Sequence, residues 1–122
     1  MPIAIWCVLI AGLLPYVAAA IAKTGGHFDN ANPRDWLAKQ EGFRRRANAA
    51  QSNGFETFPL FAIAAIIAMT IKHPNQHHVD LWAMGFVAAR LAYLGFYLAN
   101  LAALRSIAWT AGMACVIALF VL

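Results

Sequence analysis

The chain has little charge for its length, and few residues that bind metals or form disulfides. Charged residues are 11% of its 122 residues, whereas soluble globular domains average about 25%. Its two cysteines, Cys7 and Cys115, lie in apolar runs and are interpreted as packing residues. His73, His77 and His78 lack a fourth ligand at convincing spacing, so we predict no metal site. Low charge excludes an ordinary soluble domain, and a hydrophobic content of 62% favours lipid as the solvent.

Acidic residues are scarcer than basic ones, and the basic ones are unevenly placed. The formal net charge is +4. One polar stretch holds six of the nine Lys and Arg residues: Lys23, Arg34, Lys39, Arg44, Arg45 and Arg46. Nucleic-acid binding needs basic residues spread along an exposed face together with aromatic residues for stacking. A single basic loop between apolar segments is instead typical of a cytoplasmic loop, so we predict no nucleic-acid partner.

Four apolar segments are long enough to cross a membrane, because about 20 helical residues span the hydrocarbon core. The predicted helices cover residues 3–22, 43–71, 79–101 and 104–122, and residues 23–42 form the substantial loop. The connections after residues 71 and 101 are short, which favours antiparallel neighbours in a bundle. We therefore predict a single all-α domain over residues 1–122, an integral membrane four-helix bundle.

The loop over residues 23–42 and the distribution of charge predict the topology. Gly25-Gly26 and Asn32-Pro33 are turn signals, and residues 35–42 are expected to form a short interfacial helix. Lys23, Arg34 and Lys39 of this loop, the three arginines at the start of the next helix and Arg105 fall on one membrane side, against Lys72 on the other. The positive-inside rule then places this loop in the cytoplasm and both termini outside, in an inner or cytoplasmic membrane.

Polar residues recur at helical spacing in the second and third predicted helices, although these helices are expected to be surrounded by lipid. Steps of three and four residues place a set on one face of the second helix: Arg46, Ala49, Asn53 and Glu56. The same steps relate a set in the third helix: Arg90, Tyr93, Tyr97 and Asn100. Arg105 opens the fourth helix on the same membrane side. Ionisable residues within a span are costly, so these side chains are expected to face protein, water or a ligand.

Two interpretations of these residues follow. In the first, Glu56 and Arg90 form a structural ion pair that fixes the helix register. In the second, the helices enclose a polar cleft for an anionic, peptide-like or amphiphilic ligand, with arginines for carboxylates and Asn53 for an amide. Three arginines (Arg46, Arg90 and Arg105) against one carboxylate favour the cleft, because the surplus positive charge needs an anion.

The stretch from Asn32 to Phe61, NPRDWLAKQEGFRRRANAAQSNGFETFPLF, resembles the MAPEG family, the membrane-associated proteins in eicosanoid and glutathione metabolism. Its RANAAQSNGFETFPLF portion is similar to that family's signature at the start of the second helix. The AARLAYLGFY stretch is similar to the matching part of the third helix. The resemblance covers essentially the whole chain. It implies a homotrimer of four-helix subunits, with glutathione bound between subunits near the cytoplasmic face.

The resemblance also implies roles for individual residues. Those expected to bind glutathione are Arg46, Asn53, Glu56, Arg90, Tyr93 and Tyr97. Arg105 is expected to be the catalytic residue, because an arginine at the start of the family's fourth helix can stabilise the glutathione thiolate. Ala49 and Thr57 stand where the glutathione-using branch has an arginine and often a tyrosine.

The implied function is that of a membrane-bound glutathione-dependent transferase or peroxidase, which activates the thiol and acts on lipophilic electrophiles or hydroperoxides. Its partners would be glutathione as co-substrate, a lipophilic second substrate and membrane lipid. The alternative is a non-catalytic membrane protein that binds a lipid or a partner in the same cleft, so enzyme activity stays open. A small proton-coupled exporter is disfavoured, because residues 3–22 contain no carboxylate.

Overall fold

The computed structural model describes residues 1–25 and 27–122, so Gly26 of the predicted Gly25-Gly26 turn lies outside the described residues. The helices are α1 (Ile3–Ala22), α2 (Pro33–Ala38), α3 (Gly42–Ile67), α4 (Gln76–Leu98) and α5 (Ala102–Val121), and the π-helical segment η1 (Ala68–Lys72) extends α3. Within these residues, α1, α3 with η1, α4 and α5 are each long and apolar enough to span a membrane. The protein is an all-helical, multi-pass integral membrane protein.

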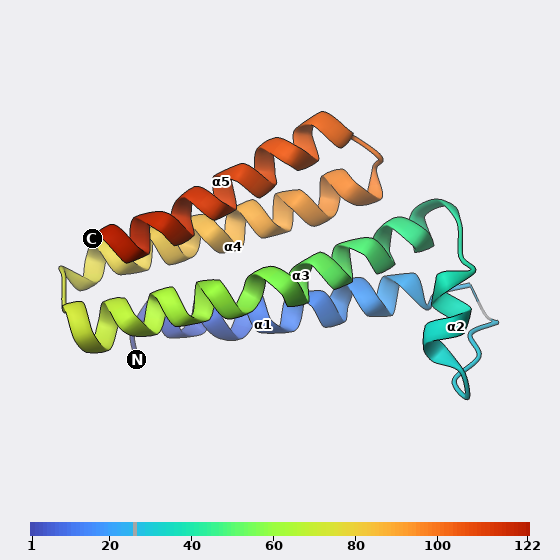
Figure 1. The fold of residues 1–122 in the computed structure, drawn as a ribbon, viewed down its shortest axis with the longest axis horizontal. Coiled ribbons are helices and arrows are strands. Elements are labelled where there is room, and N and C mark those ends of the chain that lie inside the picture. The colour runs from blue at the N-terminus through green and yellow to red at the C-terminus, as the bar shows by residue number, and fades with distance from the viewer. Residues whose placement is uncertain (26) are drawn as a thin grey trace.

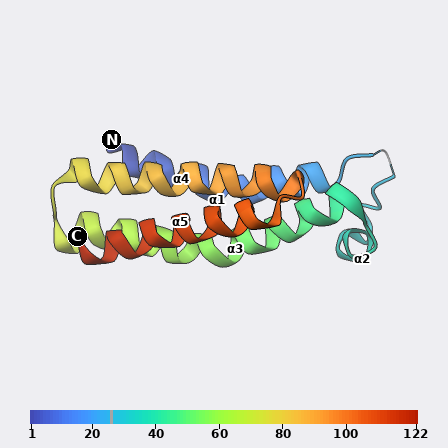
Figure 2. The same ribbon diagram turned by 90° about the horizontal axis from the view of Figure 1, so that it is seen from above.

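The long helices form two antiparallel pairs, α1 with α3 and α4 with α5 (Figure 1). In the view turned by 90°, α4 is drawn over α1, and α5 is drawn over α3 (Figure 2). Both chain termini and the α3–α4 connection lie at one end of the bundle, here called the terminal end (Figure 1). Helix α2 and the α4–α5 turn lie at the other end, the loop end, toward which α5 diverges from α3.

Small and aromatic residues pack the helices together. Phe61 of α3 and Phe86 of α4 stack with ring centroids 4.0 Å apart and an interplanar angle of 9°. Gly54 of α3 faces Pro15 of α1, and a Cβ atom at position 54 would lie 2.7 Å from the Pro15 Cγ atom. A glycine here lets the two helices approach closely, as small residues do at helix interfaces in membranes. Pro15 and Pro59 both lie inside continuous helices.

At the terminal end, polar groups are bonded to backbone groups of other helices. The Asp80 carboxylate of α4 accepts hydrogen bonds from the Ala4 backbone N–H, at 2.9 Å, and from Gln76 Nε2, also at 2.9 Å. Ala4 is in the first turn of α1, where N–H groups have no partner within the helix and a negative charge is favourable. Lys72 Nζ donates to the Phe120 carbonyl at the end of α5.

The bounds of α4 differ from the predicted helix over residues 79–101. It begins at Gln76, because the Asn75 side chain accepts a hydrogen bond from the His77 N–H at 3.0 Å and caps the helix. It ends at Leu98, because Asn100 takes a left-handed conformation with φ 61°. Asparagine tolerates this conformation better than most residues and commonly ends helices in it. Asn100 therefore lies in the turn before α5 and not on the helical face predicted for it.

At the loop end, a short helix packs against the start of α3, close to the end of α1. Helix α2 covers Pro33–Ala38, whereas residues 35–42 were expected, because proline is favoured in the first turn of a helix. Leu37 is buried beside Ala22 and Ala47. Arg44 Nε donates to the Thr24 carbonyl at 2.6 Å, so this side chain holds the loop against the start of α3.

Candidate functional site

Two arginines and two tyrosines form a continuous series near the loop end. The Arg90 guanidinium lies over the Tyr93 ring, with its Cζ atom 4.1 Å from the ring centroid. Tyr93 meets Tyr97 edge to face, with centroids 5.5 Å apart. Arg105, in the first turns of α5, places its Cζ atom 4.4 Å from the Tyr97 centroid. The α4–α5 turn therefore closes a series of alternating cationic and aromatic groups that spans both helices.

A hollow of about 250 Å³ lies beside the outer half of this series. Its lining comes from α4 and α5: Tyr93, Tyr97, Arg105, Ser106, Trp109 and Thr110. An open surface patch on α5 continues from this hollow and shares Ser106 and Thr110 with it. The other residues of the patch are apolar: Ile107, Ala111 and Ala114. A charged, aromatic recess and an open apolar face of α5 are thus contiguous.

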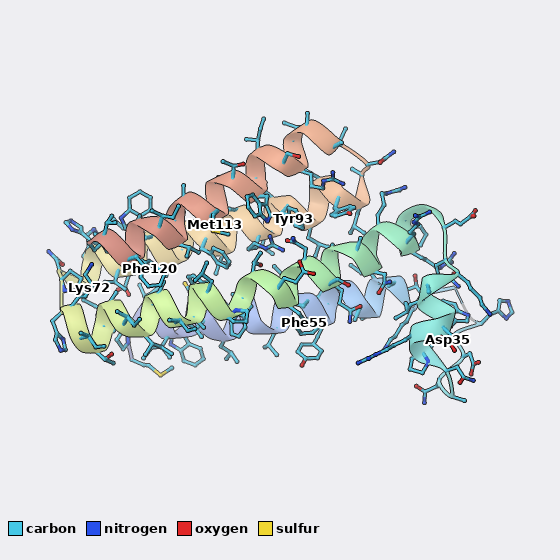
Figure 3. The ribbon with its side chains drawn as sticks, viewed as in Figure 1. Asp35, Phe55, Lys72, Tyr93, Met113 and Phe120 are labelled. Carbon is cyan, nitrogen blue, oxygen red and sulfur yellow. The ribbon has the colours of Figure 1, made fainter. Side chains whose placement is uncertain are left out.

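Arg90 lies on the inner side of the series. It is 7% exposed and lines a cavity of about 20 Å³ between α1, α3 and α4. Tyr93 borders both this cavity and the larger hollow, and Figure 3 shows it beside the α4–α5 pair. Arg90 precedes the end of α4 by eight residues (98 − 90), which places it about 12 Å from Leu98 along the helix.

The ion pair between Glu56 and Arg90 is wrong for this chain. Glu56 is exposed on α3, whereas Arg90 is buried. Among the described residues, no Asp or Glu oxygen lies within 4.0 Å of a Lys, Arg or His nitrogen. The prediction failed because helical spacing gives the face and depth of a residue but not the rotation of one helix against another. The buried Arg90 charge therefore has no carboxylate partner.

Arg46 has a contact that its sequence position did not suggest. Its Nε and Nη2 atoms donate to the Leu98 carbonyl at 3.3 and 3.1 Å. The last carbonyls of a helix lack partners within it and carry the negative end of the helix dipole. Arg46 of α3 thus caps the C-terminus of α4, and its role in binding a ligand stays a prediction.

Two amide side chains on α3 have oxygens that are buried without a partner. Among the described residues, Asn53 Oδ1 and Gln51 Oε1 contact no hydrogen-bond donor. Such acceptors are uncommon in proteins, because removal from water without a replacement bond costs about 1–3 kcal/mol. Gln51 was not among the predicted site residues, because it lies about 200° around the helix from Asn53 and so outside the predicted polar face. Both acceptors are free to accept a hydrogen bond from outside the described residues.

The structure therefore brings together one part of the predicted site. Arg90, Tyr93, Tyr97 and Arg105 form one series, whereas Asn53 and Glu56 lie on α3, outside the residues that line the hollow. The sequence argument also missed three lining residues of α5: Ser106, Trp109 and Thr110. Their signal was available, because positions 105, 106, 109 and 110 recur one turn apart on a single face.

Among known protein families, the MAPEG family matches residues 3–122. The chain belongs to the MAPEG family. The matched residues include all four spanning helices and the loop between α1 and α3. MAPEG proteins are typically glutathione-dependent transferases or peroxidases of membranes. Among curated proteins, none matches this chain.

Proposed function

We propose that this MAPEG protein is a glutathione-dependent transferase or peroxidase that acts on lipophilic electrophiles or hydroperoxides from the membrane. The observation that carries the proposal is the position of Arg105. Its guanidinium borders a hollow with Tyr93 and Tyr97, next to an open apolar face of α5. A cationic donor beside an apolar, lipid-accessible surface suits a reaction between an anionic sulfur and a lipophilic partner.

Arg105 would activate the thiol of glutathione by stabilising its anion. The S–H bond breaks, the proton passes to water, and the sulfur lone pair accepts N–H donors from the guanidinium, which favours the charged form. The thiolate then attacks an electrophilic carbon, a C–S bond forms, and the leaving group departs with its electron pair. With a hydroperoxide, the thiolate attacks the terminal oxygen instead: an S–O bond forms, the O–O bond breaks, and the leaving alkoxide takes a proton from water to give an alcohol. The resulting glutathione sulfenic acid reacts with a second glutathione to give the disulfide and water.

Recognition of the peptide would draw on both helical pairs. Arginine suits the carboxylates of glutathione, and the buried oxygens of Asn53 and Gln51 suit its N–H groups. Glu56 suits an ammonium group; it is exposed on α3 and is not among the residues that line the hollow of its own chain. We therefore infer a homotrimer in which α3 of one subunit faces the α4–α5 hollow of the next. An exposed carboxylate on a spanning helix supports a covered interface, because charges within membranes face protein or water.

The loop end is inferred to face the cytoplasm. It holds the basic residues of the first loop and Arg105, whereas Lys72 lies at the terminal end. This asymmetry is the one that sets orientation in membranes. It would place the hollow on the side where glutathione is made and kept reduced, near the membrane surface.

The test is a titration of the detergent-purified protein with glutathione at neutral pH, with heat and ultraviolet thiolate absorbance recorded together. Saturable binding with thiolate absorbance would support the proposal and justify a screen of electrophiles and hydroperoxides. Binding without thiolate absorbance would favour the alternative, a non-catalytic protein that binds a ligand in this cleft; Ala49, which replaces an arginine, is the feature that favours it. No binding at millimolar glutathione would overturn both the substrate and the chemistry.

A further inference from the structure

Arg90 is the one charged side chain among the described residues that is buried. It is 7% exposed, and it lies within α4, a spanning helix. A guanidinium has five N–H donors and keeps its charge under all conditions in which proteins fold. A buried charge is costly unless an opposite charge and hydrogen bonds compensate it. Its surroundings must therefore supply that compensation.

Among the described residues, the helices packed around Arg90 bring no carboxylate within 4.0 Å of its guanidinium. Helix α1 has no ionisable residue except Cys7 and Tyr16, and Glu56 of α3 is exposed. Helix α5 contributes Arg105, which adds positive charge on the far side of the tyrosines. The Tyr93 ring supplies a cation–π contact at 4.1 Å, which is a weak substitute for a counter-ion.

The cavity beside Arg90 has room for one small species. Its volume of about 20 Å³ exceeds the 10–15 Å³ or so that a single water molecule needs. Besides Arg90, its lining includes the Thr57 hydroxyl, which donates to the Gly54 carbonyl at a long 3.4 Å and can turn to another acceptor. The rest of the wall comes mainly from small and apolar residues of α1 and α3. A tripeptide is too large for this space.

We propose that this cavity binds one monovalent anion of the size of chloride, held by the Arg90 guanidinium and the Thr57 hydroxyl. The guanidinium supplies the opposite charge, and both groups supply donors at one side of a small, mostly apolar space. The site lies behind Tyr93, separate from the hollow beside Arg105. The inference requires no turnover, so it stands or fails independently of the proposed enzyme activity.

Thermal unfolding of the purified protein in detergent tests the site. Chloride, bromide and gluconate are compared as sodium salts at the same pH and ionic strength, because gluconate is too large for the cavity. We expect a saturable rise in Tm with chloride and bromide over gluconate, about 5 °C at ten times the Kd. A Tm that is equal in all three salts would overturn the proposal and favour a water molecule that bridges Arg90 and a backbone carbonyl.

Two variants assign the response to the cavity. Arg90→Met should eliminate the halide response, and Thr57→Val, which keeps the side-chain volume, should raise the halide midpoint about tenfold. If Arg90→Met does not fold, Thr57→Val decides, because it leaves Arg90 in place. Arg45→Met is the matched control, since Arg45 is exposed on α3, and its response should equal that of the original protein. A halide midpoint that is unchanged in Thr57→Val would contradict the assignment.

A carboxylate of glutathione has the same chemistry as a halide toward Arg90, so a final arm separates the two sources. The halide series is repeated at saturating glutathione. A halide response that persists supports a free ion in its own site. A response that glutathione eliminates would mean that Arg90 binds the peptide, and would overturn the separate halide site.

Discussion

The two ends of the bundle use their polar residues in opposite ways. At the terminal end, Asp80 is bonded to the first turn of α1, and Lys72 is bonded to the last turn of α5. At the loop end, Arg90 lacks a carboxylate, and the oxygens of Asn53 and Gln51 lack donors among the described residues. The labelled side chains in Figure 3 mark this contrast, with Lys72 near Phe120 at one end and Tyr93 between the helical pairs.

This difference separates polar groups that stabilise the fold from buried polar groups that have no partner in the described part of their own chain. A polar group with a partner in its own chain lowers the free energy of the folded state, so its loss destabilises the protein. A buried polar group without one raises that free energy, and persists where a ligand or a partner subunit completes it. Substitutions at the terminal end should therefore change stability and spare binding, and substitutions in the site should do the reverse.

The largest effect is expected at Arg105. Arg105→Gln removes the positive charge beside the hollow and leaves a side chain of similar length, so thiolate absorbance should disappear. Under the proposed mechanism, kcat/KM should fall about 100- to 1000-fold, as for loss of one preorganised charge-stabilising donor. Tm should change by less than about 4 °C, because the substitution removes only a cation–π interaction worth about 0.5–1 kcal/mol. Arg45→Gln is the control, and full activity in Arg105→Gln would exclude Arg105 as the activator.

Substitution of Asp80, at the terminal end, should change stability and leave binding unchanged, the opposite of the result expected at Arg105. Asp80→Ala leaves the Ala4 N–H and Gln76 Nε2 without their acceptor, so the free energy of unfolding should fall by about 2–3 kcal/mol. Glutathione affinity should not change, because Asp80 lies at the opposite end from the hollow. Denaturant titration and calorimetry measure the two quantities. Asp35→Ala, in exposed helix α2, is the control and should shift stability by less than about 0.5 kcal/mol.

The contact between α1 and α3 tests whether close helix packing holds the inner cavity in shape. Gly54→Ala places a Cβ atom 2.7 Å from the Pro15 Cγ atom, so the helices must separate, at a cost of about 1–3 kcal/mol. Gly95→Ala is the matched control in α4, where a Cβ atom meets nothing within 4 Å. That variant should gain about 0.5–1 kcal/mol, because alanine loses less entropy than glycine in a helix. Equal stability of the two variants would contradict the packing argument.

The smallest effect should be the most informative one. Asn53→Leu removes a buried acceptor that lacks a donor in its own chain, so the ligand-free protein should become about 1 kcal/mol more stable. Glutathione affinity should fall about tenfold if the amide accepts an N–H group from the peptide. Ser52→Ala, at an exposed neighbour on the same helix, should change neither property. A loss of stability in Asn53→Leu would mean that the amide serves the fold rather than a ligand.

The sequence by itself determined the class of protein, the four spans and half of the residues that line the hollow: Tyr93, Tyr97 and Arg105. These follow from local signals, because span length, the run of apolar residues and a period of three to four residues do not depend on the neighbouring helix. The family signature likewise lies within two short stretches of sequence, from Asn32 to Phe61 and around Arg90. The ends of α4 differ from the predicted ones, because the Asn75 side chain caps the start of the helix and Asn100 ends it in a left-handed conformation.

Only the tertiary structure decided which polar groups contact each other. Arg46 bonds to the carbonyl of Leu98, 52 residues away, and Arg90 lines a small cavity and forms no ion pair with Glu56. Each residue along a helix advances about 1.5 Å and turns by about 100°, so a shift of one residue in the register between helices exchanges the partners of a side chain. Periodicity within one helix carries no information on that register. It is set by contacts such as that of Gly54 with Pro15.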